Sequence, residues 1–303
     1  MTGNRLLITG AAGFTGRHAC RYFVDSGYDV VAVVRNVTSP EPVAEGCRTV
    51  ACELTDSRAV HKLMEDTKPD YLLHLAGMNA VSESWKRPAD CMETNVLATF
   101  YLLDAARLVN PSCRILAVSS MLNFAMTSEA PKPPHPYSLS KTMQLLAAQS
   151  WGHLFGQPVL FVQPSNLIGP GPSNGICGLL AKWVSEVEAG RSAAPFVLSS
   201  YEEKRDFLDV RDAVAAYAVI LERGSEGAAY KIGSGTQRLL GETVEAFKNQ
   251  SPAELKISIR ENQLSLPDPE PVDLTLISAL GWRPAIPFEH SIEGALAYFR
   301  RRS

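Results

Sequence analysis

The sequence predicts an α/β protein in which a doubly wound parallel sheet carries a smaller, discontinuous α/β domain. Short apolar runs typical of buried strands alternate with amphipathic stretches at helical spacing over about the first 160 residues. A chain of 303 residues, 46% of them hydrophobic, is long enough for one large domain and a smaller one. A turn rich in glycine and proline, 169–172, marks the expected boundary between the two.

The composition argues against several classes of partner. The net charge of -3 gives no basic field for nucleic acid, and no apolar run is long enough to span a membrane. The chain leads directly into a strand, without a secretory or transit segment, so we expect a cytoplasmic protein. The six cysteines are scattered, and Cys47 and Cys52 lack a second pair of ligands. We therefore expect reduced structural thiols and no metal site.

The first strand leads into a glycine-rich turn and a helix. The run Leu6–Ile8 is typical of a buried strand, and three glycines follow it at a spacing of three. Such glycines permit a tight turn, close approach of a ligand and close packing of the helix, whose first N–H groups favour a phosphate. This order predicts a Rossmann-type dinucleotide cradle, with an ordinary glycine-rich turn as the alternative. The expected contacts are Gly10, Gly13, Phe14, Thr15 and Gly16.

The end of the second strand bears on the choice of coenzyme. Residues 28–34 read as a strand that completes a parallel βαβ unit, and Arg35 and Asn36 follow it. An acidic residue at this point would accept hydrogen bonds from both ribose hydroxyls of NAD, whereas a guanidinium suits the 2′-phosphate of NADP. We therefore expect NADP(H), with NAD(H) possible; the alternative is that Arg35 is a solvated surface residue.

Two further strands complete the expected dinucleotide-binding half. Residues 48–54 read as the third strand, and Asp56 either caps the helix 57–67 or approaches the adenine, capping being favoured. Residues 71–77 read as the fourth strand, whose small residues at the end suit close approach of a coenzyme. His74 lies inside that strand, which favours a core residue over a base. The further coenzyme contacts expected here are Leu54, Leu75, Ala76 and Gly77.

The chemistry is expected on the helix that follows the fifth strand. Residues 90–109 form a long amphipathic helix with Asn95 in its interior, and residues 113–119 form a strand that leads into Ser120. Tyr137 and Lys141 are four residues apart and share one face of the next helix, 137–151. A nearby ammonium lowers the pKa of a phenol, which can then exchange a proton with an alkoxide. Ser120 can polarise the carbonyl oxygen; an incidental Tyr/Lys pair is the alternative.

Together these features resemble the extended short-chain dehydrogenase/reductases, the NAD-dependent epimerase/dehydratase family, which act on nucleotide sugars. The resemblance rests on the three glycines, the serine-ended strand, Tyr137-x-x-x-Lys141 and Asn95, and it covers essentially the whole chain. It implies that Ser120, Tyr137 and Lys141 are catalytic, that Asn95 is structural, and that NAD(P) lies across the sheet. It also implies that Tyr137, Lys141 and Pro164 contact the coenzyme.

The second half of the chain looks like the GDP-4-keto-6-deoxy-D-mannose reductases. The matching stretches are 164–171, 204–212, 230–235 and 280–284. The resemblance implies a sugar-nucleotide site that contains Ser120, Met121, Asn166, Lys182 and Arg205. Arg205 would pair with phosphates, because a guanidinium suits phosphate oxygens; an ion pair with Asp206 or Asp209 is the alternative. The implied domains are 1–165 with 208–232 for the dinucleotide, and 166–207 with 233–303 for the nucleotide sugar.

Three departures from the family pattern refine the expected function. The related 4,6-dehydratases carry an Asp-Glu pair after the catalytic serine or threonine, where this chain has Met121 and Leu122. Without those carboxylates elimination lacks its proton shuttles, so hydride transfer is favoured. Phe124-Ala125 replaces a Tyr-Gly pair of the lid over the sugar, and Leu266-Pro267 replaces an Arg-Pro that helps to hold the nucleotide.

These features predict an NAD(P)H-dependent reductase of the C4 ketone of a nucleoside-diphosphate 4-keto-6-deoxyhexose. The expected conversion is GDP-4-keto-6-deoxy-D-mannose to GDP-D-rhamnose. The alternatives are an epimerase or another 4-ketoreductase on the same fold, and a non-catalytic NADP-binding protein. The apolar faces of helices 90–109 and 137–151 favour a homodimer with a four-helix core, unless they are buried within one chain.

Overall fold

The structure is a computed structural model that describes residues 4–37, 43–124, 130–260 and 268–302. These residues fall into two compact units. The first comprises Met1–Gln163 and Val214–Tyr230, and the second comprises Pro164–Ala213 and Lys231–Ser303. The segment that returns to the first unit is therefore 214–230, against the 208–232 expected from the sequence. The assignment of coenzyme and nucleotide sugar to these units stays a prediction.

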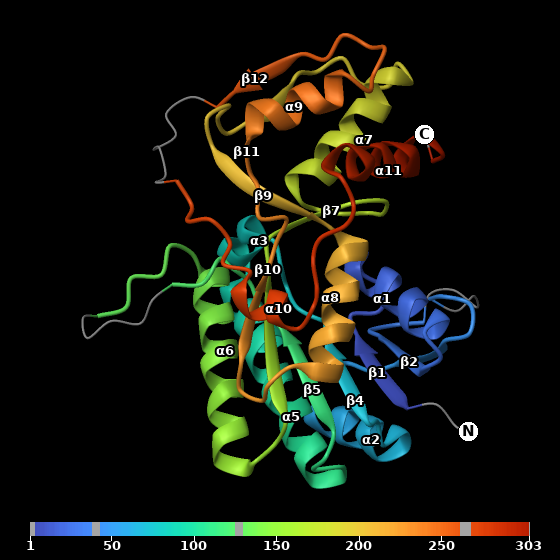
Figure 1. Cartoon of the computed structure of the whole chain (residues 1–303), viewed down its shortest axis with the longest axis vertical. Helices are drawn as coiled ribbons and strands as arrows, with labels where there is room; N and C mark the ends of the chain where they lie inside the picture. The colour runs from blue at the N-terminus through green and yellow to red at the C-terminus, as the bar shows by residue number, and fades with distance from the viewer. Residues whose placement is uncertain (1–3, 38–42, 125–129, 261–267, 303) are drawn as a thin grey trace. The chain divides into compact units, whose positions relative to one another are not determined.

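A seven-stranded sheet organises the first unit, in the order β10-β6-β5-β4-β1-β2-β3 (Figure 1). Its strands are β1 (Arg5–Thr9), β2 (Asp29–Val34), β3 (Arg48–Ala51), β4 (Tyr71–His74), β5 (Arg114–Val118), β6 (Val159–Pro164) and β10 (Ala229–Ile232). Each neighbouring pair from β6 to β3 is parallel. Because β1 lies between β2 and β4, the winding reverses beside β1, which is where ligands bind in open sheets of this kind.

Helices cover the sheet on both faces. They are α1 (Phe14–Asp25), α2 (Ser57–Thr67), α3 (Val81–Lys86), α4 (Pro88–Met92), η1 (Glu93–Leu97), α5 (Ala98–Val109), α6 (Pro136–Phe155) and α8 (Val210–Arg223). Alternate strand residues such as Leu7 and Leu72 share one core cluster with α2, α5 and α6. Their neighbours Leu6 and Leu73 point the other way and are equally buried. Burial on both faces explains why these strands are almost continuously apolar.

Most sequence-based boundaries hold within a few residues, and the helix expected over 90–109 is the informative difference. Asp56 caps α2, since its Oδ1 accepts from Arg58 N at 2.9 Å and Ala59 N at 3.2 Å, so the predicted cap is confirmed. The helix expected over 90–109 is instead α4, a π-helical turn and α5. Asn95 lies in the π turn, which widens the helix by one residue at this point. The sequence signals both the helix and the unusual asparagine but not the local change of winding.

The second unit contains two small sheets and four helices. The sheets have the orders β11-β9-β7 and β12-β8. Their strands are β7 (Asn166–Ile168), β8 (Phe196–Leu198), β9 (Lys204–Asp209), β11 (Gln237–Leu239) and β12 (Ile257–Ile259), and the helices are α7 (Ile176–Glu188), α9 (Leu240–Lys248), α10 (Thr275–Ala279) and α11 (Phe288–Arg300). A separate core joins these elements, including Phe207, Phe247 and Ile292.

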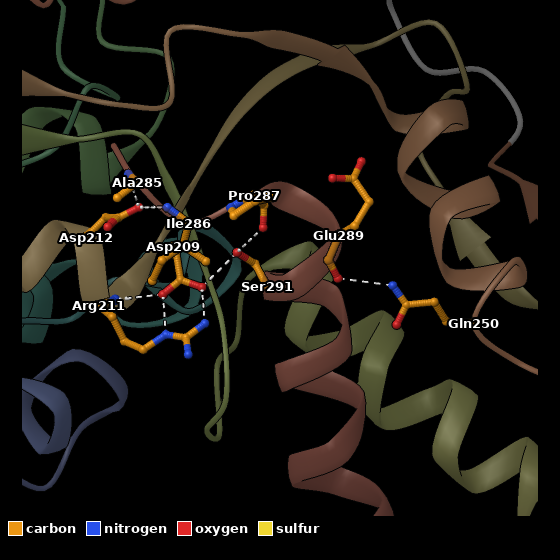
Figure 2. Close-up of polar contacts among 9 residues, drawn as sticks. All are labelled: Asp209, Arg211, Asp212, Gln250, Ala285, Ile286, Pro287, Glu289 and Ser291. Atoms are coloured by element: carbon orange, nitrogen blue, oxygen red, sulfur yellow. Dashed lines mark hydrogen bonds and ion pairs between the residues drawn. The ribbon is translucent and has the colours of Figure 1, made fainter. Parts of the chain in front are cut away.

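Asp209 at the end of β9 and Asp212 in the first turn of α8 hold α11 and the loop before it (Figure 2). The buried Asp209 carboxylate accepts from Ser291 Oγ at 2.7 Å and from the guanidinium of Arg211 at 2.8 Å. Burial alone would raise the pKa of Asp209, but the hydrogen bonds from Arg211 and Ser291 outweigh burial and hold that pKa below its ordinary value. Asp212 accepts from the backbone N–H groups of Ala285 and Ile286. This part of the 204–212 stretch is thus structural.

Candidate active site

The glycine turn has no room for side chains. Gly10 adopts a φ of +66°, and a Cβ on it would lie 2.8–2.9 Å from the backbone of Leu75 and Ala76. A Cβ on Gly16 would overlap the carbonyl oxygen of Gly10, so helix α1 can pack on the turn only with glycine at this position. Gly13 N donates to Gly10 O at 3.0 Å and closes the turn. The backbone is therefore held at the carboxyl end of β1, beside the end of β4.

The start of α1 fits the pyrophosphate of a dinucleotide. Gly13 is the N-cap and makes no side-chain capping bond, and the described first turn carries no acidic residue. The first N–H groups of a helix have no intrahelical partner, and the helix dipole adds a partial positive charge there. Phe14 and Thr15 supply such N–H groups, and Gly13 just before them is exposed. These residues fit NAD(P), whose chemistry is hydride transfer.

The residues after β2 lie at the surface. The Arg35 side chain is 70% exposed, and its Nε lies 3.5 Å from Glu53 Oε2. Asn36 is also exposed. An exposed ion pair of this length contributes little to stability, so the guanidinium is free to exchange Glu53 for another anion. Leu54, the residue after Glu53, is at the margin of the core cluster that covers the sheet.

Asn95 fixes the loop that follows β4. Its Nδ2 donates to Met78 O at 3.0 Å and to Ser140 Oγ at 2.8 Å, and its Oδ1 accepts from Met78 N at 2.7 Å. The side chain is fully buried, so these bonds satisfy an amide that would otherwise be costly in the core. Asn95 thereby ties Met78, and with it Ala76 and the exposed Gly77, to α6. Its structural role is confirmed by these contacts.

Ser120 lies near Tyr137, close enough for its hydroxyl to lower the pKa of the Tyr137 phenol. Tyr137 is 6% exposed, its ring stacks on His135, and its backbone N donates to Ser84 Oγ at 3.1 Å. Burial raises the pKa of Tyr137, and the Ser120 hydroxyl offsets only part of this shift. The prediction of a lowered phenol pKa is therefore wrong for this arrangement, because desolvation of the phenolate is the larger effect.

Lys141 is buried on the same helix, but its ammonium is directed elsewhere. Nζ donates to Val118 O at 3.2 Å and to Gln144 Oε1 at 2.9 Å. A Cβ added to Gly77 would lie 3.5 Å from this Nζ, which places the ammonium beside the loop after β4. Burial lowers the pKa of Lys141 to about 8. The amine therefore remains mostly protonated at neutral pH despite being almost inaccessible.

Because His74 is buried as a neutral imidazole, we expect the stability of the protein to depend on pH. Burial, with a smaller contribution from the Lys141 ammonium, lowers the pKa of His74 to about 3 from 6.5. Between these values the unfolded chain binds a proton that the folded chain does not. Stability is therefore complete above about pH 6.5 and falls as the pH decreases towards 3, by about 1.4 kcal/mol per unit. Urea unfolding at several pH values should show a slope shallower by this amount in His74→Gln; equal slopes would contradict the assignment.

The second unit contains three of the residues predicted to bind the sugar nucleotide, namely Asn166, Lys182 and Arg205. Asn166 Nδ2 donates to Asp206 O at 3.0 Å, and Asn166 pairs in register with Phe207. Arg205 forms an ion pair with Glu203. The alternative interpretation from the sequence, an ion pair of Arg205 with Asp206 or Asp209, is therefore wrong. Asp206 instead accepts from the loop that begins at residue 234, and Asp209 from Arg211, which leaves neither carboxylate for Arg205.

The remaining predicted residues have diverse surroundings. Lys182 is 59% exposed on α7 and makes a loose pair with Glu186, 3.8 Å away. Pro164 ends β6, and Met121 is partly exposed after β5. Ala125 and Leu266-Pro267 lie outside the described residues. The structure thus places Ser120 near Tyr137. In the described part of the chain the Lys141 ammonium bonds to Val118 and Gln144 and makes no hydrogen bond to the Tyr137 hydroxyl.

Sequence reasoning missed two polar residues that support the site. Gln144 is 1% exposed and accepts from Lys141, and Thr99 is 2% exposed and accepts from Gln144. Their spacing was the available signal: Gln144 follows Lys141 by three residues and Thr99 follows Asn95 by four, so each pair shares a helix face.

A parallel dinucleotide-type sheet, a glycine turn at its switch point and a buried Tyr137 near Ser120, on the helix that also carries Lys141, define an NAD(P)-dependent enzyme. Comparison with known protein families supports this class of enzyme, because residues 6–233 match the NAD dependent epimerase/dehydratase family. The chain belongs to this family, as the sequence predicted. The doubly wound fold and the NAD(P)-dependent class of enzyme are likewise confirmed.

The proteins that this chain resembles differ in activity: they include a reductase, a dehydratase and an epimerase. The chain is 28% identical to GDP-6-deoxy-D-mannose reductase of Pseudomonas aeruginosa, with 98% of each chain covered. It is 26% identical to dTDP-D-glucose 4,6-dehydratase of Mus musculus, covering 98% of this chain and 89% of the relative. Among solved structures, RMD from Pseudomonas aeruginosa complexed with NADPH has a TM-score of 0.84 at 27% identity, covering 99% and 100%. UDP-glucose 4-epimerase from Thermotoga maritima has a TM-score of 0.86 at 21% identity, covering 98% and 99%.

None of the helices in the described residues has both the length and the apolar character needed to cross a bilayer.

Proposed function

We propose that the protein reduces the C4 ketone of a nucleoside-diphosphate 4-keto-6-deoxyhexose with NAD(P)H, GDP-4-keto-6-deoxy-D-mannose being the substrate and GDP-D-rhamnose the product. The likeness to a GDP-6-deoxy-D-mannose reductase over nearly the whole chain supports this choice. Met121 and Leu122 support it too, because neither side chain can supply the acid and base that a dehydratase needs. Epimerisation and reduction of another 4-keto sugar remain the outcomes against which the proposal is tested.

The buried Tyr137 with the half-buried Ser120 near it is the observation that carries the proposal. A phenol whose pKa is raised by burial stays protonated at neutral pH, and this is the form that donates a proton to an alkoxide. Ser120 Oγ lies near the same hydroxyl and polarises the carbonyl oxygen. When bound, NADPH supplies the hydride. Lys141 holds a positive charge close to Gly77, where the coenzyme's ribose is expected.

The activity is tested with a panel of 4-keto-6-deoxy sugars attached to GDP, dTDP and UDP. We expect loss of the reduced-nicotinamide absorbance with the GDP sugar, at the highest kcat/KM of the three. Fastest turnover of the dTDP or UDP sugar would assign another 4-ketoreductase. Nucleotide hexoses that carry a C4 hydroxyl are tested in parallel. Interconversion of their C4 epimers without net oxidation of NADPH, and with no reduction of the keto sugars, would assign an epimerase and would overturn the proposal.

Arg35 is proposed to select NADP(H). Its exposed guanidinium, loosely paired with Glu53, is available for a 2′-phosphate at the end of β2. Loss of such a charged hydrogen bond costs about 1.5–3 kcal/mol, or about 10- to 100-fold in Kd. Arg35→Ala should therefore weaken NADPH by that factor and NADH by less than about twofold, as measured by calorimetry. The matched control is Arg21→Ala, an exposed arginine of α1 paired with Asp25; equal losses for both coenzymes would refute the role of Arg35.

For the nucleotide sugar, Asn166, Lys182 and Arg205 are proposed as contacts, with Arg205 exchanging Glu203 for a phosphate oxygen. A homodimer also remains a proposal. Helices η1, α5 and α6 leave several large apolar side chains exposed, namely Leu97, Leu108, Met143, Leu146, Leu154 and Phe155. Apolar surface of this kind marks association sites. Sedimentation at the mass of two chains is expected; a single-chain mass at micromolar concentration would contradict it.

A further inference from the structure

A continuous chain of buried hydrogen bonds runs from the end of β1 to the catalytic helix. Thr9 Oγ1 lies 2.7 Å from His74 Nδ1, and His74 Nε2 lies 3.0 Å from Thr99 Oγ1. Gln144 Nε2 donates to the same Thr99 oxygen at 2.9 Å, and Gln144 Oε1 accepts from Lys141 Nζ at 2.9 Å. Each of these five residues is at most 5% exposed, so water does not compete for the bonds.

The direction of every bond in this chain follows from the single proton of Thr99. Thr99 Oγ1 donates it to Asn95 O at 2.8 Å, which closes a bond to the preceding helical turn. Thr99 can then only accept, so His74 must donate from Nε2. His74 is neutral and has one ring proton, so its Nδ1 accepts from Thr9 Oγ1. Thr9 Oγ1 in turn accepts from Ala76 N at 3.2 Å, and no donor faces a donor.

The same reasoning fixes the amide of Gln144. Because Thr99 has no proton left to give, the group of Gln144 that faces it must be the NH2. The carbonyl oxygen of Gln144 is therefore directed at the ammonium of Lys141. A reversed amide would place two acceptors together at Thr99 and NH2 against an ammonium at Lys141, which costs two buried hydrogen bonds.

We propose that Gln144 is a positioning residue, held by Thr99 and His74, whose amide oxygen keeps the Lys141 ammonium charged and beside Gly77. The proposal rests on the proposed function in so far as Lys141 belongs to the catalytic set. Besides Gln144, only Val118 O accepts from this ammonium in the described part of the chain. Without the Gln144 oxygen, a buried cation would keep one long bond of 3.2 Å, and its charged form would be disfavoured.

The other titratable groups around the ammonium do not replace this acceptor. His74 of β4 stays neutral, since burial lowers its pKa to about 3. Tyr137 of α6 remains a phenol because burial raises its pKa. Cys91 of α4 donates its thiol to Ser140 Oγ at 3.4 Å. Cys91 raises the pKa of Lys141 by less than burial lowers it, and neither His74 nor Tyr137 supplies a negative charge at neutral pH. The two carbonyl oxygens are therefore the hydrogen-bond acceptors that stabilise the ammonium.

The test is the titration of Lys141 by NMR of protein labelled at the lysine ε-carbon, with Lys141→Arg to assign the signal. In the intact protein we expect a pKa near 8. Gln144→Leu should lower it by about one unit, because one of two acceptors is lost. Gln144→Glu should raise it by about one unit or more, because a carboxylate faces the ammonium. The basic limb of the pH profile of kcat should move in the same directions, with little change in KM.

The matched control is Gln157→Leu. Gln157 is 3% exposed, and neither its Nε2 nor its Oε1 has a partner in the described residues. The same substitution there should leave the Lys141 titration unchanged. An unshifted Lys141 pKa in Gln144→Leu or in Gln144→Glu overturns the proposal, and so does an equal shift in Gln157→Leu. The titration needs no turnover, so inactivity of the wild-type protein towards every keto sugar would reject the proposed function and leave this inference to be decided separately.

Discussion

Tyr137→Phe is expected to lower kcat for ketone reduction by roughly 10²- to 10⁴-fold, the range that a positioned general acid contributes. The substitution removes only the hydroxyl near Ser120, and the ring stays packed against His135. Affinity for NADPH should change by less than about threefold, since the phenol donates its proton during the reaction rather than in the ground state. Steady-state kinetics with the keto sugar, together with calorimetry of NADPH binding, check both expectations.

Tyr217→Phe provides the matched control for this substitution. Tyr217 is fully buried on α8, and its hydroxyl has no partner in the described residues. Removing that hydroxyl should leave kcat unchanged and the free energy of unfolding equal or slightly higher, because an unsatisfied polar group leaves the core. If Tyr137→Phe keeps more than about half of the wild-type kcat, Tyr137 is not the acid.

Gly10→Ala is expected to cost about 2–5 kcal/mol in the free energy of unfolding. Part of this cost is the positive φ of +66°, which disfavours any L side chain by about 1–2 kcal/mol. The rest is the overlap of the new Cβ with the backbone of Leu75 and Ala76, 2.8–2.9 Å away, which displaces the end of β4 at about 1–3 kcal/mol. Because the turn and the end of β4 move apart, dinucleotide affinity should fall more than tenfold. Thermal unfolding and calorimetry measure the two effects.

Gly156→Ala separates strain from overlap. Gly156 ends α6 with a φ of +63°, nearly that of Gly10, but a Cβ there would meet no atom within 4 Å. This variant should lose only the conformational part, about 1–2 kcal/mol, and should bind NADPH normally. Equal stability losses in Gly10→Ala and Gly156→Ala would show that the close approach to Ala76 is unimportant.

Local patterns predicted most of the fold. The apolar runs became parallel strands because both faces of the sheet are covered, and this requires the near-continuous hydrophobicity that the sequence displays. The glycines at 10 and 16 were predictable because close backbone approach tolerates no Cβ. Asp56 was predictable as a cap because the interaction is local, between residues two and three apart.

Non-local contacts limited the prediction of the site. Spacing places Tyr137 and Lys141 on one helix face, but the direction of the ammonium depends on Val118, which is remote in the sequence, and on Gln144. The sign of the Tyr137 pKa shift depends on burial, which spacing does not reveal. Arg205 pairs with Glu203, while Asp206 accepts from Ser234 and Gly235 and Asp209 from Ser291, which are remote in the sequence. In each case the deciding partner comes from tertiary packing.

The most direct test of the account follows a deuterium label from the coenzyme to the sugar. The protein is mixed with GDP-4-keto-6-deoxy-D-mannose and NADPH deuterated at the transferable position of the nicotinamide, and the product is examined by NMR. The account predicts one deuterium at C4 of the product hexose for each coenzyme oxidised, with formation suppressed in Tyr137→Phe. Unlabelled product, or coenzyme that stays reduced in the presence of the keto sugar, would contradict it.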